Sequence, residues 1–167
     1  MENQIVKRFA EQYENMAEWV GMNIEPLNDD EYKWELSPGK NHGVWLLGHL
    51  ITSDDDFSLF MGRGEMLYPE YPAIFGEGSK LQSVDNYPSV AVLKEQWKNV
   101  VEKNKKVYAD LKDAELDERH GMIKDYEDYK KDSFKTKMSV IMHWQLHQMY
   151  HAGQLGILVS RAGKSRF

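Results

Sequence analysis

Apolar residues recur with the helical repeat in four stretches of the chain, and no stretch alternates convincingly as a β-strand does. These stretches cover residues 2–22, 37–61 (with a start at residue 41 as the alternative), 89–111 and 136–161. Ser89 is a suitable helix N-cap for the third. The connection 62–88 is rich in glycine, proline and aromatic residues and predicts a long irregular crossover. The pattern therefore predicts an all-α protein, a four-helix bundle with a long crossover between its second and third helices.

Size and composition narrow the classes of function. A chain of 167 residues without internal repeats or linkers predicts a single domain, 1–167. A net charge of -6 argues against nucleic-acid binding, which needs a basic surface. No apolar run approaches the roughly 20 residues of a membrane span, and the first residues do not resemble a signal peptide. We therefore expect a cytoplasmic protein that contacts neither nucleic acid nor membrane.

Three of the six histidines follow one another at four-residue spacing, as His143, His147 and His151. Four residues along a helix turn through about 400°, so these side chains form one stripe. Two of them can close on one metal ion, but the outer two lie about 12 Å apart along the axis. A third ligand must come from elsewhere, and His49 on the second apolar stretch is the best candidate.

Spacing alone leaves two histidine pairs open, His143 with His147 and His147 with His151. Small residues favour the second pair, because Gly153 and Gly48 would allow a neighbouring helix to approach closely. The simpler interpretation is that these are hydrogen-bonded core histidines and that the glycines mark ordinary helix crossings. The chain has no cysteine, so any bound metal must be held by histidine or carboxylate.

Three further residues are candidates for supporting or substrate-binding roles. Gln154 follows His151 by three residues and shares its stripe, so its amide could orient a ligand or a substrate. Asp56 follows His49 by seven residues and could accept an imidazole N–H or hold a substrate group. His143 is expected to line the site rather than bind the metal.

Other polar and aromatic residues are assigned by the same helical phase. Asp54 and Asp55 are expected to point into solvent, and His120 is expected to be exposed within a charged connection. The aromatic residues of the crossover either form a wall over the metal or seal one end of the bundle, and we favour the second interpretation. They are Tyr68, Tyr71, Phe75 and Tyr87.

The motifs in residues 41–50, 75–79, 87–89 and 147–154 occur in an order that resembles the DinB-like superfamily. The resemblance implies a four-helix bundle, often a homodimer, with a divalent metal held by three histidines. These ligands map onto His49, His147 and His151. His42 departs from the pattern, which more usually has a small or polar residue there.

Three neutral imidazoles leave a divalent ion with open coordination positions, as in catalytic sites. Imidazole ligands suit several divalent ions, and we expect Zn or Ni, with Fe, Mn and Cu as further candidates. The resemblance implies a metal-dependent S-transferase that joins a low-molecular-weight thiol to a small-molecule electrophile. The alternatives are a metal-dependent hydrolase, a non-catalytic metal- or ligand-binding protein with a stress-related role, and a dimeric interaction protein with a structural metal.

Overall fold

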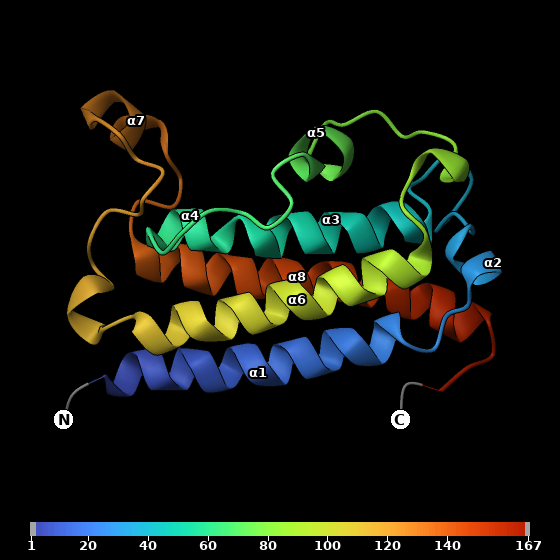
Figure 1. Ribbon diagram of the computed structural model, residues 1–167, viewed down its shortest axis with the longest axis horizontal. Helices are drawn as coiled ribbons and strands as arrows, with labels where there is room; N and C mark the ends of the chain where they lie inside the picture. The colour runs from blue at the N-terminus through green and yellow to red at the C-terminus, as the bar shows by residue number, and fades with distance from the viewer. Residues whose placement is uncertain (1–2, 166–167) are drawn as a thin grey trace.

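The computed structural model describes residues 3–165, and four long helices form its body (Figure 1). They are α1 (Gln4–Ile24), α3 (Gly43–Asp55), α6 (Val90–Asp110) and α8 (Lys137–Arg161). Helix α1 packs on α6 and α8, and α3 packs on the same two helices from the other side. Residues 3–165 contain no β-strand, only two isolated bridges, so the all-α prediction is confirmed. No helix in this range has the length and hydropathy of a membrane span.

Side-chain caps define where the long helices begin. Ser89 accepts a hydrogen bond from the Val92 amide and caps α6, as predicted. Thr136 caps α8 and forms a reciprocal capping box with Ser139. His42 caps α3 through its ring Nδ1, which accepts from the Trp45 amide at 3.1 Å. The residue that departs from the DinB-like motif therefore performs a structural role.

Short helices and 3₁₀ turns occupy the connections between the long helices, including the crossover 62–88 that was predicted to be irregular. They are α2 (Asp29–Tyr32), α5 (Tyr71–Phe75), α7 (Tyr126–Lys131) and the 3₁₀ turns η1 (Val84–Asn86) and η2 (Asp113–Glu115). The predicted helix 37–61 is also interrupted, since α3 ends at Asp55 and α4 (Phe57–Met61) follows it. Elements this short have no hydrophobic period of their own and depend on caps and tertiary packing.

The crossover folds back over α3, and α5 lies along it (Figure 1). The ring of Phe75 is fully buried against Gly48. A Cβ atom at Gly48 would lie 2.2 Å from this ring, so no larger residue fits without displacement. Gly48 therefore fixes the height of α5 above α3.

Two aspartates near the end of α3 are buried, which corrects the prediction that they point into solvent. Asp55 accepts hydrogen bonds from the backbone amides of Leu67 and Tyr68 and pairs with Lys103. Asp54 accepts from the Tyr13 hydroxyl at 2.6 Å, and burial raises its pKa to about 7. The crossover covers this end of α3, and its amides need acceptors that helical phase alone does not reveal.

His120 is also buried rather than exposed, with only 1% of its surface accessible. Its Nε2 lies 2.9 Å from an Asp132 carboxylate oxygen, and its ring packs on Phe60. The charged connection 112–135 therefore folds onto the α4 end of the protein through the packing of His120 on Phe60, although most of its residues are solvated.

Candidate metal centre

Three histidines from two helices converge on one point. His49 comes from α3, and His147 and His151 come from successive turns of α8. The His147 Nε2 lies 3.4 Å from the His49 Nε2 and 3.1 Å from the His151 Nε2. One ligand atom from each of the three residues lies within 4.8 Å of the others. The structure thus brings together the three residues that the resemblance implied as ligands.

These separations fit a shared cation. Imidazole binds zinc at about 2.0–2.1 Å, so two such ligands at a tetrahedral angle lie about 3.3 Å apart. At a right angle, as in an octahedral site, they lie about 2.9 Å apart. The two observed distances, 3.1 and 3.4 Å, agree with these values. The His147 Nε2 therefore lies at ligand spacing from both other histidines, and all three ligand atoms lie within 4.8 Å of one another.

The opposite ring nitrogens fix the orientation of two of these histidines. The His49 Nδ1 lies 2.7 Å from the Phe75 carbonyl oxygen, and the His151 Nδ1 lies 2.7 Å from the Gln154 Oε1. Carbonyl and amide oxygens only accept hydrogen bonds, so both rings carry their proton on Nδ1. Their Nε2 lone pairs then face the same centre, where His147 can donate a proton to only one of them. A cation at this centre satisfies all three lone pairs.

Burial keeps the three imidazoles neutral, which is the form that binds metal. Desolvation, assisted by the neighbouring histidines, lowers the pKa of His147 to about 4. Desolvation also lowers the pKa of His151 to about 4, against the hydrogen bond that its Nδ1–H donates to Gln154, and lowers the pKa of His49. Protons therefore compete weakly for this centre at neutral pH.

A cavity of about 300 Å³ adjoins the histidines. Residues of α3 and α8 line it, together with Pro72 of α5, the two residues that follow α5, and Phe134. The lining residues are His49, Thr52, Ser53, Asp56, Pro72, Gly76, Glu77, Phe134, His143, Trp144 and His147. A ligand in this cavity could reach the centre from the side of His49 and His147.

Asp56 lines this cavity but does not contact an imidazole. Its Oδ1 accepts a hydrogen bond from the Trp144 Nε1 at 2.6 Å. Burial raises the pKa of Asp56 to about 7. The suggested contact with an imidazole is therefore replaced by one with an indole, because the partner of His49 comes from the crossover instead.

His143 lies outside the group of three converging nitrogens. Its ring stacks on Phe134 at a centroid distance of 4.1 Å and forms part of the cavity wall. Of the two histidine pairs that spacing left open, the structure groups His147 and His151 with His49.

The small residues near the site do not act as expected. A Cβ at Gly153 would meet no atom within 4 Å, so this glycine does not admit a neighbouring helix. Gly48 does permit a close approach, but the approaching element is α5. In the crossover, the Phe75 ring stacks on Tyr87 and meets Tyr71 edge to face, and none of these three residues lines the cavity.

Two features of the site were missed by the sequence reasoning. The Phe75 carbonyl is a backbone group in an irregular segment, and no residue pattern indicates it. Glu77 lies two residues further on, lines the cavity and acts electrostatically on His49. The Phe75–Ser79 segment carried the DinB-like resemblance, which was the only signal that it bears on the site.

The sequence was compared with models of known protein families and with curated proteins. Residues 9–155 match the model of the DinB superfamily, which covers most of the chain and includes all three converging histidines. No curated protein matches the chain. On the strength of the family match, the chain belongs to the DinB superfamily.

Proposed function

We propose that the chain binds a divalent metal, Zn or Ni, through His49, His147 and His151. The observation that carries this proposal is the convergence of three Nε2 atoms, two of them on rings held by acceptors at Nδ1. Three imidazole ligands leave at least one coordination position for another molecule. His147 and His151 are only partly buried, which supports access from the outside.

We further propose that the protein is a metal-dependent S-transferase for small molecules. His49, His147 and His151 would hold the ion, which would supply the charge that ionises a thiol at neutral pH, as it does for a cysteine ligand. The chain contains no cysteine, so the thiol has to belong to a small-molecule cosubstrate. The adjoining cavity of about 300 Å³ could hold the thiol and orient an electrophile beside it.

The test is thiol conjugation by protein that has been purified anaerobically and loaded with Zn or Ni. We expect conjugation of a low-molecular-weight thiol to an electrophile above the uncatalysed rate, and a loss of at least about 100-fold in His151→Ala. In cobalt-substituted protein, thiol addition should produce a sulfur-to-metal charge-transfer band. Conjugation at equal rates by wild type and the correctly folded variant would contradict the proposal.

A metal-dependent hydrolase is the second candidate, and Glu77 is the residue that favours it. This carboxylate lines the cavity and acts electrostatically on His49, so it is placed to accept a proton near the centre. Ester and amide hydrolysis by the same preparations separates the two candidates. A hydrolase should release product without thiol and lose activity in Glu77→Gln, whereas the transferase requires the thiol.

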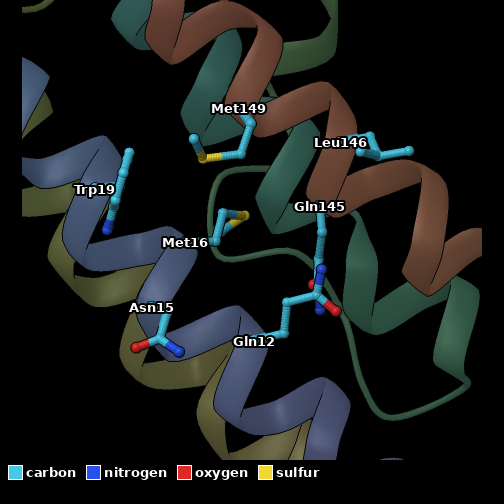
Figure 2. A pocket seen from close by; sticks show the side chains of 7 residues that line it. All are labelled: Gln12, Asn15, Met16, Trp19, Gln145, Leu146 and Met149. Carbon is cyan, nitrogen blue, oxygen red and sulfur yellow. The ribbon is translucent and has the colours of Figure 1, made fainter.

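The exposed surface formed by α1 and α8 supports the proposal of a homodimer. Between Lys137 and Arg161, α8 contains no Asp, Glu, Lys or Arg, although 29% of the whole chain is charged. Its exposed residues include Leu146, Tyr150 and Ile157, which are 67%, 65% and 52% accessible. A hollow of about 280 Å³ lies between the two helices, and Figure 2 shows Met16 and Met149 facing each other across it. A second copy would cover the uncharged face of α8 and this hollow with its own equivalents.

Placing a charge on this surface should produce monomers. We expect Leu146→Glu to shift wild-type dimers to monomers by light scattering after size exclusion, because the charge would be buried in the interface. The matched control is Val92→Glu on α6, which replaces an equally apolar residue that is 46% accessible. A monomeric wild type, or two variants with equal effects, would contradict the assignment of this surface.

A further inference from the structure

The cavity beside the histidines has two chemically different ends. His49 and His147 line one end, where the proposed metal would lie. Asp56 lines the other and follows His49 by seven residues, which is about 10 Å along the helix axis. Asp56 therefore lies about two helical turns from His49. A molecule that occupied the whole cavity would present one end to each site.

One oxygen of the Asp56 carboxylate is engaged by a hydrogen bond, and the other can accept one from a ligand. The Trp144 indole donates to Oδ1, which fixes the orientation of the group. The nearest buried cation, Lys103, is already paired with Asp55. Burial without a cationic partner explains why the pKa of Asp56 is raised, and a cation in the cavity would relieve this cost.

The remaining lining favours a cation over an anion or a neutral group. Asp56 and Glu77 are the charged residues of the described lining, which includes no Lys or Arg. The aromatic side chains of Trp144 and Phe134 form the wall near Asp56 and pack against each other. Carboxylates and aromatic rings together are the usual surroundings of a bound ammonium group.

We propose that this cavity selects small molecules carrying a protonated amine about 10 Å from the end that binds the metal, and that Asp56 binds the amine. The assignment rests on the proposed function for the metal-binding end and adds the class of substrate. The expected ligand is thus an aminothiol with an extended spacer, or a similar molecule with another metal-binding group.

The test compares two thiols of equal length on zinc-loaded protein by titration calorimetry. We expect 6-aminohexanethiol to bind at least about tenfold more tightly than 6-mercaptohexanol, the gain of one buried charge-assisted hydrogen bond. Asp56→Asn keeps an acceptor for the Trp144 indole and should abolish this preference without changing the affinity for the alcohol. Asp54→Asn is the matched control, because Asp54 is a buried carboxylate of α3 that does not line the cavity, and it should retain the preference.

A second measurement tests binding at Asp56 with a ligand that carries no metal-binding group. Hexylammonium added to the protein should shift the Trp144 indole N–H resonance, assigned with Trp144→Phe, and hexanol should not. If neither thiol binds but hexylammonium shifts this resonance, the thiol chemistry fails and the amine site stands. If both thiols bind equally, or if the preference survives in Asp56→Asn, the amine site is wrong and the metal function is unaffected.

Discussion

Replacing His49 or His147 with alanine should remove the divalent metal from the purified protein, whereas His143→Ala should retain it. His147 shares the centre with His49, their Nε2 atoms lying 3.4 Å apart. His143 lies one helical turn earlier on α8, where its ring stacks on Phe134. The loss of one of three ligands typically lowers the affinity for zinc by several orders of magnitude.

The measurement is the metal content of anaerobically purified protein by mass spectrometry, with helical content followed by circular dichroism. His143→Ala and His147→Ala form a matched pair, since both remove an imidazole from the same helix. We expect about one equivalent of metal per chain in the first and almost none in the second, with equal helicity. Equal retention in both would reject the ligand set of His49, His147 and His151.

Replacing Gly48 with alanine should both destabilise the protein and weaken its metal site. The added Cβ would lie 2.2 Å from the Phe75 ring, so α5 has to move. That movement also displaces the Phe75 carbonyl, which holds the His49 Nδ1. We expect a loss of about 2 kcal/mol in the free energy of unfolding. The loss of this hydrogen bond should lower the metal affinity about tenfold or more.

Gly21→Ala is the control for the change in helix propensity. Gly21 lies on α1, away from the histidines, and a Cβ there would meet no atom within 4 Å. Its replacement should raise stability by up to about 1 kcal/mol and leave metal binding unchanged. Urea unfolding gives the stability of both variants, and metal competition gives the affinity. A neutral or stabilising effect of Gly48→Ala would show that α5 does not orient His49.

The long helices could be predicted because their apolar period and their caps are local features. Ser89 and Thr136 cap helices where the sequence placed the beginnings of helices. The short helix α5 could not be predicted, because its position depends on the contact between Phe75 and a glycine far earlier in the chain. Helical period likewise missed the buried state of Asp55, which depends on amides from the returning crossover.

In the candidate site too, features within one helix could be predicted, and contacts between distant residues could not. The spacing of His147 and His151, and of Gln154 three residues later, is a property of one helix, and all three lie as that spacing implies. Helical phase also placed Asp56 on the same side of α3 as His49, and both line one cavity. The partner of Asp56 could not be predicted, because Trp144 lies 88 residues away in the sequence.

The convergence of α3 and α8 has a consequence for the lifetime of the protein. An ion shared by His49 and His147 would join positions that are 98 residues apart in the sequence. Cross-links that close such long loops restrict the unfolded chain strongly, and this chain has no disulfide that could do so. Resistance to proteolysis would then depend on the concentration of free metal in the surroundings. When that metal is scarce, the protein would be degraded faster.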